Sequence, residues 1–110
     1  MKIEFKNNKL KKQLGNASEI KKAFGEMAKK IAVRLSEIVA APNLAVLIQV
    51  AGPKCHALQG ERSGEWAVSI SPNYRLIFEI DHNPIPLNPD SSVNTKSITD
   101  ILITEIDDYH

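Results

Sequence analysis

The sequence contains one cysteine, Cys55, only 5% aromatic residues and no long apolar run. A lone cysteine excludes an internal disulfide framework and a thiolate metal cluster, and it makes the cytoplasm the expected compartment. No apolar stretch approaches the roughly 20 residues that a transmembrane helix needs, so we expect no membrane partner. The beginning of the chain, MKIEFKNNKLKKQ, is charged and lacks the apolar segment of a signal peptide. These absences indicate a globular protein that works in water.

What the sequence does contain is an uneven distribution of charge. A hydrophobic content of 43% with 25% charged residues is ordinary for one globular domain, which we expect to span residues 1–110. Residues 1–62 hold 12 Lys and Arg against 5 Asp and Glu, a net +7, whereas residues 63–110 hold 2 against 8, a net −6. This polarity suggests a basic face for a polyanion or an acidic partner, although the solvated face of a Lys-rich helix would give the same pattern.

The spacing of apolar residues predicts a strand and a long helix near the start. Alternation in MKIEF favours a strand over residues 1–5, and residues 6–15 form a polar, basic connection. Apolar side chains then recur every three or four residues, which predicts a helix over 17–41. Asn16 is its expected N-cap, and Pro42 ends it because proline disfavours helical geometry in the preceding residue.

The rest of the chain changes to a period of two. Residues 43–53, NLAVLIQVAGP, fit a short helix with Asn43 as its N-cap or a buried strand, and their Ala, Leu and Gln content favours the helix. Alternating residues predict an antiparallel hairpin from strands over 65–71 and 74–80, followed by a Pro-rich loop over 81–97 and a last strand over 98–106. The order of elements predicts an α+β fold, a small antiparallel β-sheet with helices packed on one face.

Three groups of residues could carry chemistry. His56 lies just before the hairpin in CHALQGERSGEW, Arg75 lies one residue into an otherwise apolar strand, and DDYH covers residues 107–110. Each also has a structural explanation, because His56 can be a hydrogen-bonded loop histidine and Arg75 can pair with Glu65 or Glu79 across the sheet. Their significance therefore rests on the set as a whole.

Other motifs are weaker. Cys55 beside His56 has the residue types of a nucleophile pair, but neighbouring residues in an extended segment point apart. Gly60 and Gly64 bracket a turn, yet the Lys-Ser/Thr pair and the following helix of a phosphate-binding P-loop are missing. The three histidines show no spacing typical of metal ligands, so we expect neither a metal nor another cofactor.

Together these residue types suit metal-independent cleavage of RNA. The reaction needs a base to take the proton of the ribose 2′-hydroxyl, an acid to protonate the leaving 5′-oxygen, and cations to hold the phosphate. Imidazole can perform either proton transfer near neutral pH. Guanidinium offers a planar fork to phosphate oxygens, and tyrosine can stack on an unpaired base. Whether these groups converge is decided by the fold.

The stretch CHALQGERSGEWAVSISPNYRLIFEI and the segment DDYH resemble the HigB-type toxins of the RelE/ParE superfamily. The resemblance is close over residues 55–80 and 101–110, and over 1–54 it extends only to the layout of elements. It implies a RelE-like fold and an mRNA endonuclease that acts on mRNA in the ribosome. It also implies a HigA-type helix-turn-helix antitoxin as partner, through which alone operator DNA would be contacted.

The resemblance implies catalytic roles for His56, Arg75, Asp108, Tyr109 and His110. The two histidines would exchange protons with the substrate, and the arginine would bind phosphate. Asp108 would orient or tune His110, and Tyr109 would contact a base.

The resemblance further implies RNA or phosphate contacts for Arg62, Lys54 and Gln59. Many relatives carry a lysine where this chain has Gln59, so Arg62 or Lys54 would have to compensate, or the activity would be weaker. The loop over 82–96 is longer than a plain hairpin needs, and it could gate the site or shape antitoxin contact. Two other functions fit the superfamily: a ParE-like toxin that binds DNA gyrase without cleaving RNA, and an attenuated antitoxin-binding or co-repressor module.

Overall fold

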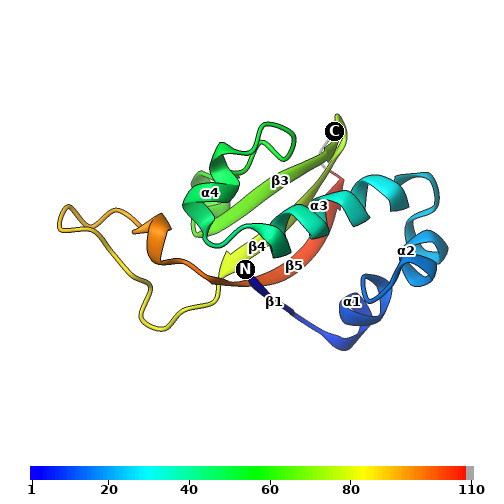
Figure 1. The fold of residues 1–110 in the computed structure, drawn as a ribbon, viewed down its shortest axis with the longest axis horizontal. Coiled ribbons are helices and arrows are strands. Elements are labelled where there is room, and N and C mark those ends of the chain that lie inside the picture. The colour runs from blue at the N-terminus through cyan, green and yellow to red at the C-terminus, as the bar shows by residue number, and fades with distance from the viewer. Residues whose placement is uncertain (109–110) are drawn as a thin grey trace.

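The computed structural model describes residues 1–108 and shows helices packed on one face of a five-stranded sheet (Figure 1). The strands are β1 (Lys2–Phe5), β2 (His56–Ala57), β3 (Glu65–Ser71), β4 (Tyr74–Ile80) and β5 (Asp100–Asp108). The helices are α1 (Asn8–Gln13), α2 (Ala17–Phe24), α3 (Ala28–Ala40) and α4 (Leu44–Gln49), with 3₁₀ turns η1 (Gly25–Met27), η2 (Gly60–Arg62) and η3 (Thr95–Ser97). The predicted α+β fold is confirmed.

The sheet has the strand order β1-β5-β4-β3-β2. The β1–β5 pair is parallel, and the other pairs are antiparallel, including the β3–β4 hairpin predicted from the sequence. The predicted first and last strands are both present, and they lie beside each other although about 100 residues separate them in the chain. Within residues 1–108 no helix is long and apolar enough to cross a membrane.

The core lies between the sheet and the helices α3 and α4. Ile31 and Ile38 of α3 are completely buried, as are Leu47 of α4 and Phe78 of β4. Trp66 stacks on Phe78 with ring centroids 6.5 Å apart and planes 19° apart. Both predicted helix faces therefore bury their apolar residues on the same side of the sheet.

The predicted N-caps are confirmed. The Oδ1 atom of Asn16 accepts a hydrogen bond from the amide of Glu19 at 2.9 Å, and Oδ1 of Asn43 accepts one from Val46 at 3.0 Å. Asn43 thus begins the helix α4, which was favoured over a buried strand for this segment. The helix α3 ends at Ala40, and Pro42 follows its C-cap Ala41, as expected for a proline that ends a helix.

The prediction of a polar connection that ends at Gly15 is wrong, because Asn8–Gln13 of this segment form α1. Asn7 caps the helix by accepting a hydrogen bond from the amide of Leu10 at 2.8 Å. Leu10 and Leu14, four residues apart, are both buried against the core. One apolar pair among several lysines is too weak a periodic signal to predict a helix. A helix this short has little stability of its own, and the burial of the two leucines stabilises it.

The single helix predicted over 17–41 is divided at Gly25. The apolar spacing continues from α2 into α3, but Gly25 has φ of 56° and ψ of −120°, a conformation that favours glycine and ends α2. The helix restarts after η1, so that α2 turns away and packs with α1 beside α3 (Figure 1). Periodicity could not reveal this break because the apolar stripe passes through it.

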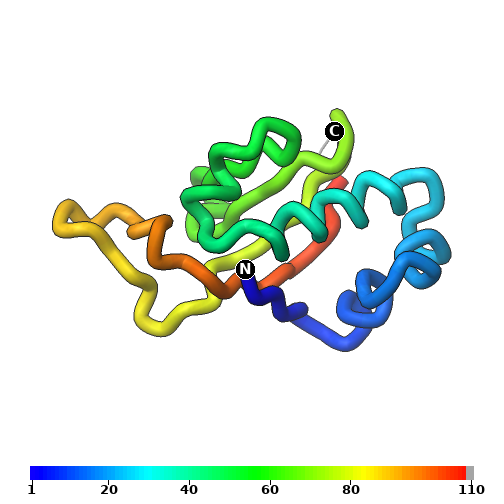
Figure 2. Tube along the Cα trace, in the orientation of Figure 1, coloured from blue at the N-terminus to red at the C-terminus, as the bar shows by residue number. Residues whose placement is uncertain are grey.

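Residues 81–99, which we call the arm, form an ordered projection between β4 and β5. The amide of Asn88 donates to the carbonyl of Ser92 at 2.8 Å, and the amide of Asn94 donates to that of Pro86 at 2.9 Å. Figure 2 shows the arm and the helices α1 and α2 at opposite ends of a molecule that measures 45 × 26 × 25 Å.

Substitution of Gly25 distinguishes this break from a continuous helix. We expect Gly25→Ala to destabilise the protein by about 1–3 kcal/mol, because alanine is strained at positive φ. In a continuous helix the same change would stabilise by roughly 1 kcal/mol, since alanine has the higher helix propensity. Urea denaturation of the two proteins measures the sign, and a stabilised variant would contradict the observed break.

Candidate functional site

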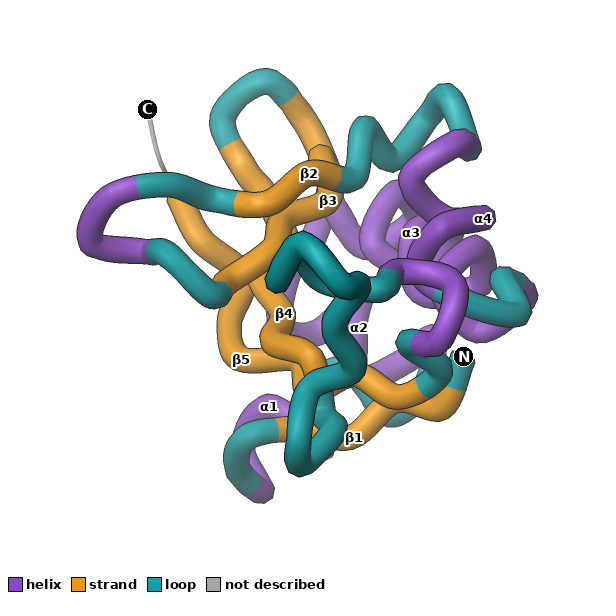
Figure 3. The backbone as a smooth tube through the Cα atoms, turned by 90° about the vertical axis from the view of Figure 1, so that its left-hand side faces the viewer, coloured by secondary structure: helices purple, strands orange, loops and turns teal. Residues whose placement is uncertain are grey.

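The candidate site lies on the sheet face opposite α3 and α4, which we call the open face. In Figure 3 the helices α3 and α4 lie to one side of the strands, and the loop that carries η2 lies to the other. Strand pairing forms two cross-strand rows on this face. The first row is His56, Ala67, Ile77 and Glu105, and the second is Ser69, Arg75 and Asp107.

An extra residue in β5 sets the direction of its acidic side chains. Ile77 pairs with Glu105, but the next residue, Phe78, pairs with Ile103, so Thr104 is a β-bulge. The hydroxyl of Thr104 donates to the carbonyl of Ile77 at 3.2 Å. Without the bulge, Glu105 would point toward the core. With it, Glu105 and Asp107 lie on the open face, and Ile106 between them packs against the core.

Arg62 of η2 bridges this face from β3 to β5. Its Nη1 atom donates to both carboxylate oxygens of Glu65, at 3.0 and 2.9 Å, and its Nη2 donates to Glu105 at 2.8 Å. Hydrogen bonds from Glu105 first and then from Glu65 raise the pKa of Arg62 above its usual range. The bridge passes over β4 and helps to explain why Ile77, outside the main core, is completely buried.

Arg75 is held on the same face by Asp107. Its Nε atom donates to Oδ2 of Asp107 at 2.9 Å, and each side chain is only 18% exposed. The partner proposed from the sequence, Glu65 or Glu79, is therefore replaced by an acid from β5. Asp108 is the cross-strand partner of Tyr74, whose ring packs against the core, so strand alternation places Asp108 on the other face from Arg75.

The open face carries more negative charge than the sequence analysis predicts. Three carboxylates, of Glu65, Glu105 and Asp107, surround the two guanidinium groups of Arg62 and Arg75, which is a net charge of −1 for these five side chains. Both arginines that the sequence assigned to phosphate are thus already paired. A phosphate at this place would have to compete with the carboxylates or use the remaining N–H groups.

His56 lies at the edge of the sheet, in the short strand β2. Its Nδ1 donates to the carbonyl of Lys54 at 2.8 Å, because a carbonyl can only accept. This contact leaves Nε2 as the ring nitrogen available for proton transfer. Lys54 itself has φ of 50°, an uncommon conformation for a side chain other than glycine, asparagine or aspartate.

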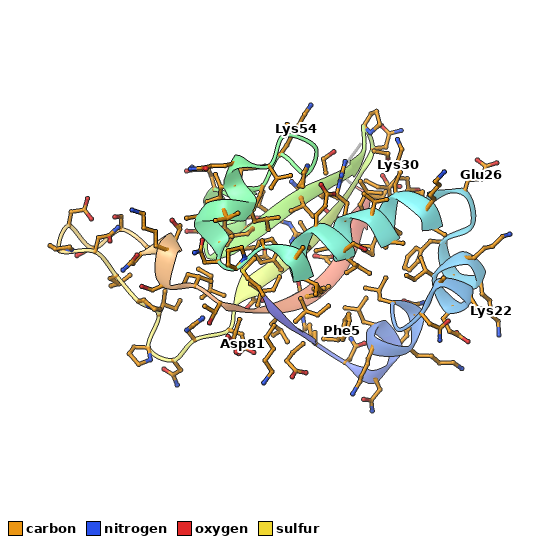
Figure 4. All side chains as sticks on the ribbon, in the orientation of Figure 1. Phe5, Lys22, Glu26, Lys30, Lys54 and Asp81 are labelled. Carbon is orange, nitrogen blue, oxygen red and sulfur yellow. The ribbon has the colours of Figure 1, made fainter. Side chains whose placement is uncertain are left out.

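A groove of about 480 Å³ adjoins His56 where β3 extends beyond β2, and we call it the basic groove. Its basic lining residues are Lys30, Arg34, Lys54 and His56, and the others are Gly52, Ser69, Ile70, Ser71 and Pro72. Figure 4 shows Lys30 and Lys54 along the same margin of the molecule, on α3 and in the loop before β2. Among residues 1–108 no carboxylate lines it.

The groove and the open face meet at Ser69, which lines the groove and pairs with Arg75 in β4. The structure therefore brings His56, Lys54 and Arg75 into one region, with Arg62 nearby on the open face. Gln59 is exposed in the loop before η2. Tyr109 and His110 lie outside the described residues.

Sequence reasoning missed Lys30 and Arg34 because it treated them as the polar side of a helix. The spacing of four residues puts both on one face of α3, but nothing in the sequence indicates that this face meets the end of β3. It also missed Glu105 and Asp107 as partners of the arginines, because the bulge at Thr104 has no clear sequence signal.

Cys55 is buried at 6% exposure against the core, on the opposite side of β2 from His56. Burial raises the pKa of its thiol to about 12. A thiol in this state is not a nucleophile near neutral pH, so a Cys–His pair is ruled out.

Comparison with solved structures identifies the fold. A YoeB/ParE toxin from Agrobacterium tumefaciens aligns over 100% of both chains with a TM-score of 0.55 and 12% identity. A YoeB–YefM complex from Staphylococcus aureus aligns over 100% of this chain and 97% of the other, with a TM-score of 0.55 and 18% identity. A mutant of YafQ from E. coli aligns over 96% and 90%, with a TM-score of 0.55 and 15% identity.

At these identities the likeness concerns the fold, which is that of the YoeB and YafQ toxins. No protein-family model matches the sequence, and no curated protein matches it significantly. The RelE-like fold implied by the sequence motifs is confirmed, whereas the HigB subtype is not tested by these neighbours.

The buried thiol predicts how stability changes at alkaline pH. The Cys55 pKa is about 12 in the folded protein against 9.0 for an ordinary thiol. The unfolded chain therefore loses this proton first, and stability falls as pH rises from 9 towards 12. By pH 11 we expect the wild type to lose about 2–3 kcal/mol relative to Cys55→Ala, at about 1.4 kcal/mol per pH unit. Urea titrations of both proteins at pH 8 and pH 11 measure this, and a constant difference would contradict it.

Proposed function

We propose that the protein is the toxin of a type II toxin–antitoxin system and cleaves mRNA on the ribosome, in the cytoplasm, by metal-independent acid–base chemistry. The observation that carries the proposal is the position of His56 between the basic groove and the row that contains Arg75. The fold shared with YoeB and YafQ toxins supports the same class. A HigB-type toxin, as the sequence motifs imply, is the subtype that we propose.

In this mechanism the 2′-oxygen of the ribose attacks phosphorus, and the bond from phosphorus to the 5′-oxygen breaks. A base takes the proton of the 2′-hydroxyl and an acid supplies one to the leaving oxygen, which gives a 2′,3′-cyclic phosphate and a 5′-hydroxyl. The Nε2 atom of His56 can perform one of these transfers, because Nδ1 is occupied by the Lys54 carbonyl. We assign the other transfer to His110.

Arg75 can stabilise the charge that builds on the phosphate. His56 of β2 and Ile77 of β4 lie in the same cross-strand row, and Arg75 is two residues before Ile77 on the same face. The Cα atoms of His56 and Arg75 therefore lie roughly 12 Å apart. Two long side chains can flank a phosphodiester and its ribose across that distance. The pair with Asp107 fixes the orientation of the guanidinium, and Asp108 and Tyr109 keep the proposed roles of tuning His110 and contacting a base.

Arg62, Lys54 and Gln59 are the proposed RNA contacts around this centre. Lys54 lines the groove, Gln59 is exposed nearby, and Arg62 is held by its carboxylate partners. Lys54 therefore compensates best for the absent family lysine, since among residues 1–108 it has no carboxylate partner.

We infer a HigA-type helix-turn-helix antitoxin as partner, with operator DNA contacted only through it, and the ribosome with its mRNA as target. A YoeB chain has been solved in complex with YefM, which supports a partner protein for this fold.

Substitution of His56 tests the proton-transfer role. We expect His56→Ala to slow cleavage of mRNA on purified translating ribosomes by about 10²–10⁴-fold. The control is His82→Gln, because His82 lies at the base of the arm and its Nε2 accepts from the amides of Thr99 and Asp100, which glutamine can also do. Primer extension maps the cut. Equal rates for His56→Ala and the control would contradict the role.

His110 has its own test. We expect His110→Ala to abolish growth inhibition and cleavage, because the proposed mechanism assigns one proton transfer to this imidazole, and a cooperative thermal unfolding transition checks that the variant is folded. Normal cleavage by the folded variant would exclude His110 as acid or base.

Induction of the wild type in cells separates the classes of function. An immediate stop in protein synthesis, with cyclic-phosphate mRNA ends, supports the nuclease. DNA damage with continued synthesis would indicate a gyrase-binding toxin, and antitoxin binding without either effect would indicate a co-repressor module.

A further inference from the structure

We propose that the basic groove between α3 and the part of β3 that extends beyond β2 binds the phosphate backbone of single-stranded RNA next to the cleavage site. This inference rests on the proposed function and adds Lys30 and Arg34 as substrate-binding residues. The groove holds about 480 Å³ and opens beside His56. It therefore provides a path by which a strand reaches the Arg75 row from outside the sheet.

Arg34 is built into the wall of the groove. Its Nε donates to the carbonyl of Ser69 at 2.6 Å, and its Nη1 donates to Glu37 at 2.6 Å. These bonds hold the guanidinium against Gly52, where an added Cβ would lie only 3.1 Å from Nη1. The side chain is 17% exposed, and its remaining N–H groups can bind a phosphate without a further loss of side-chain freedom.

Lys30 and Lys54 approach the groove from opposite sides, from α3 and from the loop before β2. Neither has an ion-pair partner among the described residues, in contrast to Arg62 and Arg75. Unpaired cations that face each other across a groove repel, and an anion between them relieves this. The groove is thus a place near His56 where a polyanion meets two lysines without ion-pair partners among the described residues, beside an Arg34 that is held by Glu37.

RNA suits this groove better than an acidic protein segment. His56 lines the groove, and the bond from its Nδ1 to the Lys54 carbonyl leaves Nε2 available for proton transfer, which a protein ligand would not require. A carboxylate-rich segment would also continue onto a face where Glu65, Glu105 and Asp107 repel it. RNA needs only one reacting nucleotide there, with its other phosphates in the groove.

The experiment measures binding of a fluorescent 12-nucleotide RNA whose 2′-oxygens are all methylated, so that it cannot be cleaved. The test protein carries Lys30→Gln with Lys54→Gly, because both changes remove a positive charge and glycine accommodates the φ of 50° at position 54. The control carries Lys2→Gln with Lys96→Gln, two exposed lysines outside the groove. Both proteins lose two positive charges.

We expect the groove variant to bind on the order of tenfold more weakly at low salt. The slope of log affinity against log salt should fall by about 1.4, or about 0.7 for each lost phosphate contact. The control should stay within about twofold of the wild type, because its lysines touch no RNA. Equal affinities for the two variants, or no binding by the wild type at low salt, would overturn the groove proposal.

Cleavage on ribosomes by the wild type is measured in parallel, which separates this proposal from the proposed function. If the wild type cleaves mRNA but the groove variant binds RNA as well as the control does, the proposed nuclease function stands and the groove proposal is rejected. Groove-dependent RNA binding without cleavage would reject the nuclease and keep the groove as an RNA site. Groove-dependent binding of poly-glutamate with groove-independent binding of RNA would assign the groove to an acidic protein and overturn the proposal.

Discussion

Strand β5 carries one residue more than β4 can pair with, and the bulge at Thr104 that absorbs it determines the chemistry of the open face. Beyond it, Ile106 reaches the core, and Glu105 and Asp107 meet the two arginines. A strand without the bulge would bury these acids, which is prohibitive without partners. The cluster of charges is therefore tied to the same irregularity that completes the core.

The consequence for function is a division of charge between two adjacent surfaces. On the open face the arginines are held rigidly by carboxylates, so they are well oriented but partly neutralised. In the basic groove the lysines have no such partners among the described residues. In the proposed mechanism, affinity for a polyanion comes from the groove, whereas orientation and charge stabilisation come from the row of Arg75.

The arm illustrates how position limits a role. It begins after Ile80, about 16 Å along β4 from Arg75, and projects away from the site (Figure 1). This placement argues against a gate over the site and leaves contact with a partner as the remaining role suggested by its length. Internal hydrogen bonds, such as that from Asn88 to Ser92, hold the outer part of the arm, and the buried side chain of Ile98 anchors its end in the core.

The sequence by itself determined the features that depend on neighbouring residues. Asn16 and Asn43 cap helices through side-chain bonds three residues away, and the β3–β4 hairpin follows from alternation around a short turn. It did not reveal the break at Gly25, because the apolar stripe is continuous through a conformation that glycine alone makes easy. The sequence also singled out His56 and Arg75 by residue type and by the family resemblance, and their catalytic roles stay predictions.

Only the tertiary structure decided which groups meet. Glu105 and Asp107, the acids of β5 that hold Arg62 and Arg75, lie 43 and 32 residues away from them in the chain, and a one-residue change of register would move both acids to the other face. The basic groove likewise exists only because α3 packs across the end of β3. Local propensities cannot encode such contacts, since they arise from the long-range pairing of strands and from the packing of a helix on the sheet.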